Sequence, residues 1–308
     1  MASTQNSTSG MTDSLIRIGT RKSPLALAQA AIVARRIENL KQGFRVHIIG
    51  ISTQGDQNQV SPLSLIGGKG IFIRELEDAL LRNEIDIAVH SLKDVTSNTY
   101  PGLALFGFLK AESVNDILVS LAGHTLESLP RHAIIGTGSM RRKAILKYLR
   151  PDVRTQDIRG NIGTRVAKLH DGLDAILLSD VSLIRLGLTR HPHQVLPANQ
   201  FIPAPGQGVI TLEARNGDHP HIRVCRQISH PVQFVLSNAQ LAFLKAVGFD
   251  CQTPLGMHSH ISNGLFSSTL FRASRDLSKT EIESFSCDIS VCLSECTKKG
   301  HEWKDSPL

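Results

Sequence analysis

An alternation of strands and helices that occurs twice constrains the fold of this chain more than any other feature. In the first unit, a short strand over 16–19 leads to a helix that begins at Ser23-Pro24 and ends near Leu40. A strand over 46–51, a helix over 72–83 and a buried strand over 85–89 follow. Serine is a favoured N-cap residue, and proline suits the first helical position. This alternation predicts a mostly parallel α/β sheet.

The same pattern starts again near Ala133, so a second α/β unit is expected. Its strands and helices are expected at 134–137, from Ser139 onward, at 153–158, at 161–170 and at 174–178. A segment rich in proline and glycine, 203–208, then leads to a strand over 209–213. A third segment carries a helix over 233–246 and an apolar stretch that should end as a helix at Lys298-Lys299-Gly300. A chain of 308 residues fits two or three domains of this kind.

Charge and composition limit the classes of partner. A net charge of +7 and a pI near 9.3 favour an anionic partner. Aromatic residues make up only 5%, and the basic residues are dispersed, which argues against binding to nucleic acid. No apolar stretch reaches about 18 residues, so no membrane span is expected. Five cysteines, an odd number, argue against a disulfide framework and favour a cytoplasmic protein.

Several arginines stand at expected helix starts, where the first N–H groups lack intrahelical partners and attract anions. Serines accompany them at two of these places, and the residues concerned are Arg21, Ser23, Ser139, Arg141, Arg142, Arg159 and Arg165. Guanidinium groups bind carboxylates through two hydrogen bonds, so this set predicts a site for a polycarboxylate. Any single arginine could instead be a solvated charge or a salt-bridge partner.

Three further residues stand in positions that suit chemistry, although each has a plainer explanation. Asp94 follows a buried strand, where it could stabilise a cation or simply cap a turn. Lys69 lies in a glycine-rich loop that lacks the spacing of a phosphate loop. Cys251 could be a reactive thiol or an ordinary buried one. Cys287, Cys292, Cys296 and His301 match no common zinc spacing, and we expect no metal.

The ordered set of motifs resembles the porphobilinogen deaminase family from about residue 16 to residue 300. The matching segments are Gly19–Ala26, Gly67–Gly70, His90–Asp94, Gly136–Arg142, Arg159–Asn161, Arg185–Gly187, Pro205–Gly208 and the turn around Cys251. Each segment is a weak signal alone, but their common order is specific.

The resemblance implies three α/β domains, the first two similar to type II periplasmic binding proteins with a cleft between them. The expected boundaries are a disordered tail at 1–14, domain 1 at 15–110 with 207–228, domain 2 at 111–206, and a small α+β domain 3 at 229–308. Domain 3 would carry a dipyrromethane cofactor, attached covalently to Cys251. The chain would act as a monomer.

By the same resemblance, the enzyme would condense four porphobilinogen molecules onto the cofactor with loss of ammonia, and then release hydroxymethylbilane by hydrolysis. Asp94 would be catalytic. Lys93, Ser139, Arg141, Arg142 and Arg165 would bind the cofactor, while Arg21, Ser23, Lys69, Arg159 and Arg185 would bind substrate. Six rings with two carboxylates each bring about twelve negative charges, which need paired donors when buried. Asp94 would favour the cationic azafulvene that forms when ammonia leaves.

The sequence departs from the family pattern at several places near these motifs. The departures are Leu65 for a common lysine, Thr96 for a proline, Ser179–Ser182 for small residues, Gln240-Leu241 for Glu-Arg, and Phe249-Asp250 for Gly-Gly. They leave open an alternative in which the chain is a weakly active or non-catalytic anion-binding relic of the same fold.

Overall fold

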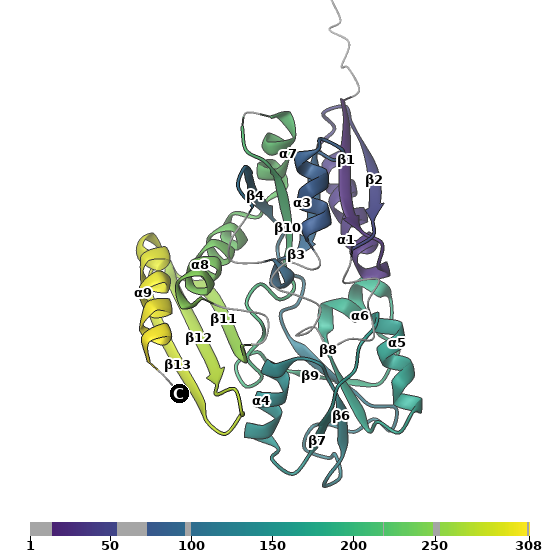
Figure 1. Ribbon diagram of the computed structural model, residues 1–308, viewed down its shortest axis with the longest axis vertical. Coiled ribbons are helices and arrows are strands. Elements are labelled where there is room, and N and C mark those ends of the chain that lie inside the picture. Colours follow the sequence, from purple (N-terminus) through teal and green to yellow (C-terminus); the bar gives the residue numbers. More distant parts are fainter. Residues whose placement is uncertain (1–13, 54–72, 96–99, 218, 249–252, 307) are drawn as a thin grey trace, which may run out of the picture.

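The computed structural model describes residues 14–53, 73–95, 100–217, 219–248, 253–306 and 308, and the strands in these residues form three sheets (Figure 1). The first sheet has the strand order β2-β1-β3-β10-β4. Its strands are β1 (Ser14–Arg21), β2 (Phe44–Ile51), β3 (Ile87–Ser91), β4 (Leu103–Phe108) and β10 (Ile210–Arg215). β1 runs parallel to β2 and β3, whereas β10 runs antiparallel to β3 and β4.

Helices α1 (Pro24–Glu38), α3 (Arg74–Leu81) and α7 (Pro220–Ile228) pack on this sheet, and the 3₁₀ turn η1 (Leu92–Asp94) follows β3. α1 begins where the sequence predicts, because the Ser23 hydroxyl accepts a hydrogen bond from the Ala26 N–H and Pro24 takes the first helical position. Its apolar side buries Val33 and Ile37 in one core with strands β1 and β3.

The second sheet has the strand order β7-β6-β8-β5-β9. Its strands are β5 (Asp116–Val119), β6 (Ile134–Gly136), β7 (Arg154–Gln156), β8 (Ala175–Ser179) and β9 (His193–Leu196). The accompanying helices are α4 (Met140–Leu149), α5 (Ile162–Ala167), the 3₁₀ turn η2 (Lys168–His170) and α6 (Asp180–Leu186). β8 is buried along its whole length, as its apolar sequence predicts.

Both sheets are mostly parallel, as expected, and each contains one antiparallel strand in the fourth position. The cause is the connectivity. β5 is the strand that the chain enters when it first arrives from the first sheet, and β10 is the strand that it enters on its return. β5 pairs antiparallel with β8 and β9, as β10 does with β3 and β4. The arrangement is the one expected for two domains similar to type II periplasmic binding proteins.

The third sheet consists of the antiparallel strands β11 (Leu255–Ser262), β12 (Leu265–Ala273) and β13 (Thr280–Asp288) in that order. Helices α8 (Pro231–Val247) and α9 (Cys292–Asp305) pack together beside it, and a 3₁₀ turn, η3 (Ile289–Val291), leads into α9 (Figure 1). Phe243 of α8 and Trp303 of α9 meet edge to face, with ring centroids 5.7 Å apart, in the core between helices and sheet. This unit agrees with the small α+β domain that the resemblance implies.

The end of α9 differs from the sequence expectation. The apolar stretch was expected to stop at Gly300, but the helix continues to Asp305. Gly300 instead lies where α9 touches α8, and a Cβ atom there would lie 2.6 Å from the Ala246 Cβ and 2.7 Å from the Phe243 carbonyl oxygen. The glycine therefore permits a close helix–helix approach and does not terminate the helix.

This contact predicts an unusual response to a Gly300→Ala substitution. In an exposed helix, replacing glycine by alanine stabilises by roughly 0.5–1 kcal/mol. Here the added methyl group meets backbone atoms of α8, so we expect a net loss of about 1–3 kcal/mol in the free energy of unfolding. Urea denaturation measures the change, with exposed Lys298→Ala as the control that should stay near wild type. A stabilised Gly300→Ala protein would contradict the packing role.

Candidate functional site

The candidate functional residues follow the carboxyl ends of parallel strands in the first two sheets. β1 ends at Arg21, and β3 is followed by η1, which carries Lys93 and Asp94. In the second sheet, β6 leads through Ser139 into α4. Open α/β sheets place their ligands at this edge, because the strand ends and helix starts converge there. The structure therefore places these predicted residues where a ligand site is expected.

The turn that carries Asp94 is held against the segment that returns from the second sheet. The Leu92 N–H donates to the Val209 carbonyl oxygen at 3.0 Å. Gly206 has a φ of 72°, and a Cβ atom at this position would lie 2.7 Å from the Leu92 Cγ and 3.0 Å from the Lys93 nitrogen. Only glycine fits this contact without strain. The Pro/Gly segment is thus packed directly on the turn that presents Asp94.

Behind this turn, β3 is attached to β10 by a buried polar contact. His90 Nε2 lies 3.0 Å from Glu213 Oε2, and both side chains are almost fully buried. Glu77 of α3 lies close to this pair, and burial, followed by the negative charge of Glu213, raises its pKa to about 7. Buried polar side chains such as His90 and Glu213 are tolerated in a core because they form a hydrogen bond with each other. The contact fixes β3, and hence the η1 turn, relative to β10.

Ser23 and Ser139 occupy N-cap positions, as predicted. The Ser23 hydroxyl accepts from the Ala26 N–H at 3.3 Å, and the Ser139 hydroxyl accepts from the Arg142 N–H at 3.4 Å. A serine hydroxyl accepts in this way while it keeps its own O–H for donation. Both serines can therefore donate to a bound carboxylate without losing their role at the helix start.

Arg141 and Arg142 are both buried and share one carboxylate, that of Asp116, which has no exposed surface. Arg141 Nη1 donates to Asp116 Oδ2 at 2.7 Å and to the Ile202 carbonyl oxygen. Arg142 donates to Asp116 Oδ1 through Nε and Nη2, and to the Leu177 carbonyl oxygen through Nη1. The two arginines, through their charge and hydrogen bonds, hold the pKa of Asp116 well below its usual range against the effect of burial.

Around Asp94, cations outnumber carboxylates. Burial, together with the charges of Arg142 and Arg141, lowers the pKa of Lys93 to about 8, although Asp94 and Asp116 oppose this shift. Burial also lowers the pKa of Arg165 to about 10, with Arg142 and Arg159 adding to the effect. Positive groups that depress one another's pKa values form a region that an anion would stabilise. The site is therefore electrostatically suited to a ligand with several negative charges.

Arg185 lies in α6, at the place where the chain crosses between the first two sheets. Its Nη2 donates to the Gly208 carbonyl oxygen at 2.7 Å, and its Nε lies 3.4 Å from Glu112 Oε2. A Cβ atom on Gly208 would lie only 2.2 Å from the Ser113 carbonyl oxygen, so the two crossing segments touch. Here Arg185 stabilises the crossover, while its predicted contact with substrate stays a prediction.

Two buried hydroxyls from the departures also lie near the crossover. Ser179 Oγ and Ser182 Oγ are 2.5 Å apart and hydrogen-bonded to each other. The two hydroxyls satisfy one another, so the charge that this departure adds is that of the half-buried Asp180 between them.

Several predicted residues lie outside the described residues. These are Lys69 and Cys251, together with the departures Leu65, Thr96, Phe249 and Asp250. The flanking structure is described on both sides of Cys251. α8 ends at Gly248, which has a φ of 73°, and the start of β11 is tied to the crossover by a hydrogen bond from the Met257 N–H to the Pro203 carbonyl oxygen at 2.9 Å.

No role was predicted from the sequence for three residues that organise the site: Asp116, Gln207 and Gln240. Gln207 Nε2 donates to Asp116 Oδ1 at 3.0 Å, and Gln240 Oε1 of α8 accepts from the Gly206 N–H at 2.9 Å. The Gln207 contact involves residues that are far apart in the chain, and no local pattern could have predicted it. For Gln240, the departure from a usual glutamate was a signal, because an amide at this place accepts the hydrogen bond without a buried charge.

No group of three or more metal-binding side chains suitable for an ion occurs within the described parts of the chain. In those same parts, no helix is long and apolar enough to cross a membrane. The four cysteines that the structure describes, Cys225, Cys287, Cys292 and Cys296, are free thiols.

The shared carboxylate predicts that Asp116→Asn lowers stability. The change leaves two buried guanidinium groups without a counter-charge, and breaking a buried ion pair on one side costs about 3–5 kcal/mol. Urea denaturation of the variant should show a loss in this range. Asp157→Asn is the matched control, because Asp157 is exposed and pairs with Lys143 at the surface, where such pairs contribute at most about 1 kcal/mol. Equal effects of the two substitutions would contradict the central role of Asp116.

Comparisons with known proteins identify the family. Residues 16–223 match the family model described as "Porphobilinogen deaminase, dipyromethane cofactor binding domain". A porphobilinogen deaminase of Coxiella burnetii is 42% identical over 253 residues, 82% of either chain, and one of Syntrophomonas wolfei is 41% identical over 250 residues, 81% of this chain and 82% of that one. One of Chloroherpeton thalassium is 34% identical over 290 residues, 94% of this chain and 92% of that one. The chain belongs to the porphobilinogen deaminase family.

Proposed function

We propose that this chain is a transferase that condenses four porphobilinogen molecules head to tail and then releases hydroxymethylbilane by hydrolysis. Each condensation forms one carbon–carbon bond and releases one ammonia molecule. The observation that carries this proposal is the cationic region around Asp94, formed by Lys93, Arg141, Arg142 and Arg165. Porphobilinogen and its oligomers bring an acetate and a propionate on every ring, and a buried polycarboxylate needs such donors.

The same residues fit a covalent dipyrromethane, the cofactor in the description of the matching family domain. Arg141 Nε is buried and has no hydrogen-bond partner among the described residues, which leaves a donor for a carboxylate. Ser139 retains its O–H for the same purpose. Lys93, with its pKa lowered to about 8, would gain a counter-charge from a bound carboxylate. Attached to Cys251, the cofactor would supply the free α-carbon that receives the first substrate.

Asp94 is suited to the chemical step by its charge and its place. It is half-buried beside Lys93 in the η1 turn, at the carboxyl edge of β3. When ammonia leaves porphobilinogen, positive charge develops on the pyrrole nitrogen. A carboxylate that accepts the pyrrole N–H stabilises this charge more than it stabilises the substrate, and so accelerates the step.

We also propose that the three sheets correspond to three domains with boundaries at 15–110 with 207–228, at 111–206 and at 229–308. The two crossings of the chain near Glu112 and Gly208 support the first two boundaries, because the segments that touch there connect the sheets. We further propose that the enzyme works as a monomer in the cytoplasm. The free thiols among the described residues support a reducing compartment.

The anchor is tested by the mass of the intact protein, produced in a host that makes porphobilinogen. We expect wild type to carry the mass of one dipyrromethane and Cys251→Ser to lack it. Cys287→Ser is the matched control, since Cys287 is a partly exposed thiol in the same domain and should keep the adduct. An unmodified wild-type protein would refute the proposed cofactor attachment.

The role of Asp94 is tested by single-turnover consumption of porphobilinogen at equal cofactor occupancy. Asp94→Asn keeps the shape but removes the charge, and we expect a loss of at least about 10²-fold in rate, the lower end of typical acid–base contributions. Folding, measured by thermal denaturation, should change little. Asp171→Asn alters an exposed carboxylate in the second sheet's unit and should keep the wild-type rate. A rate for Asp94→Asn within a few-fold of wild type would remove Asp94 from the mechanism.

A further inference from the structure

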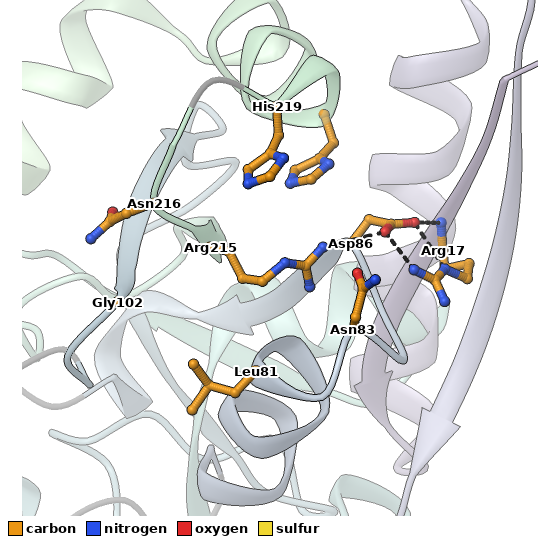
Figure 2. Close-up of a pocket in the computed structure, with 9 residues that line it drawn as sticks. Arg17, Leu81, Asn83, Asp86, Gly102, Arg215, Asn216 and His219 are labelled. Atoms are coloured by element: carbon orange, nitrogen blue, oxygen red, sulfur yellow. Dashed lines mark hydrogen bonds and ion pairs between the residues drawn. The ribbon is translucent and has the colours of Figure 1, made fainter.

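A cavity of about 710 Å³ lies at the end of the first sheet that is opposite to Asp94. Asp86, which lines it, immediately precedes β3, whereas the η1 turn follows β3. Five residues of extended strand at about 3.3 Å each separate the two ends. The cavity is therefore distinct from the candidate catalytic site. The side chains that define it are Arg17, Leu81, Asp86, Arg215, His219 and His221 (Figure 2).

Two arginines in this cavity face a single carboxylate. Arg17 donates to Asp86 through Nε at 3.1 Å and through Nη2 at 2.8 Å. Arg215 Nη2 lies 3.6 Å from Asp86 Oδ1, and its Nη1 donates to the carbonyl oxygen of Ile85 at 2.7 Å. Figure 2 shows the two guanidinium groups on either side of Asp86. One positive charge is therefore left over at the cavity wall.

The start of α7 contributes further donors to the same cavity. His219 is the N-cap residue and makes no side-chain hydrogen bond to the first turn. The His219 and His221 rings are stacked, with centroids 5.0 Å apart and planes within 9°. Figure 2 shows the His219 ring directed toward Arg215 and Asp86. Pro220 has no N–H, and the Ile222 N–H donates to the His219 carbonyl oxygen at 3.0 Å, so the donors at this end are the histidine rings.

His221 supplies an independent indication of a ligand. Its side chain lines the cavity, and the residue is only 9% exposed. Its Nε2 atom is buried without a hydrogen-bond partner among the described residues. A buried polar atom without a partner costs free energy, and a bound acceptor would remove this cost.

We propose that this cavity binds a small organic anion through its phosphate or carboxylate group, held by Arg215, His219 and His221. The pocket is largely open to solvent, and its volume of about 710 Å³ leaves room for a small organic molecule beside the bound anionic group. Leu81, 41% exposed, offers an apolar wall for the rest of the ligand. The proposal concerns a second site and is independent of the catalytic assignment.

Binding at this site takes up a proton. Burial, helped by the positive charges of Arg215, His219 and Arg17, lowers the pKa of His221 to about 4, and only Asp86 opposes this shift. An anion beside the ring favours the protonated form and raises that pKa. By linkage, the anion binds more tightly as the pH falls through the raised pKa of the bound state toward the value of about 4 in the free protein.

The test is an NMR titration of the full-length protein, labelled with ¹⁵N in histidine, at pH 5 and pH 7.5. Sodium phosphate and sodium succinate are the probes, and sodium chloride at equal ionic strength is the reference. We expect saturable shifts of the His219 and His221 signals with at least one probe, stronger at pH 5, and none at His258. If neither probe gives saturable shifts beyond those of chloride, the proposal is overturned.

Three variants sharpen this test. His219→Ala removes a half-buried donor and should weaken binding by about tenfold, as expected for one charge-assisted hydrogen bond. Asp86→Asn removes the competing carboxylate and should tighten binding several-fold, which a misfolded protein could not do. Arg82→Ala is the charge-matched control, because Arg82 lies outside the cavity in an exposed pair with Glu84. Equal affinities of wild type, His219→Ala and Asp86→Asn would refute the site.

Discussion

The hydrogen bonds and ion pairs of the buried Asp116 carboxylate are the interactions on which the arrangement of the three sheets depends. It has no exposed surface and accepts hydrogen bonds from Arg141 and Arg142 of α4 and from Gln207 of the returning crossover. Next to Gln207, the Gly206 N–H donates to Gln240 of α8, so the third unit is attached at the same place. A charge so deeply buried is stable only when it is fully paired. The contact that joins the parts therefore also holds Arg141 and Arg142 in place at the candidate site.

Much of the fold could be predicted from the sequence, because strong local signals determine it. The Ser23-Pro24 and Ser139 helix starts and the fully buried strand β8 were recognisable from capping chemistry and apolar runs. The direction of β5 and β10 was not, because it depends on the crossings between sheets and not on local sequence. Gly300 was misread for a related reason. The sequence alone does not distinguish a glycine that ends a helix from a glycine at a contact between two helices. In the structure, the close approach of Gly300 to Ala246 shows that it is of the second kind.

For the site, residue types and motif order predicted which side chains lie close together. They did not predict which hydrogen-bond partners these side chains have. Arg142 is close enough for its charge to lower the pKa values of Lys93, Arg141 and Arg165, in agreement with a polyanion site. The partner that already occupies two of these arginines, Asp116, could not be foreseen. It lies 25 and 26 positions away in sequence, at the start of an apolar strand without any local sign of pairing.

The position of β10 has a consequence for synthesis on the ribosome. β10 lies in the middle of the first sheet, between β3 and β4, yet it is made only after all strands of the second sheet. Until it emerges, the inner edges of β3 and β4 lack their partner, and unpaired edges invite association with other chains. The first sheet therefore stays incomplete during synthesis until the second unit has been made. Loss of stability in the second unit would prolong that interval and expose the first one to aggregation.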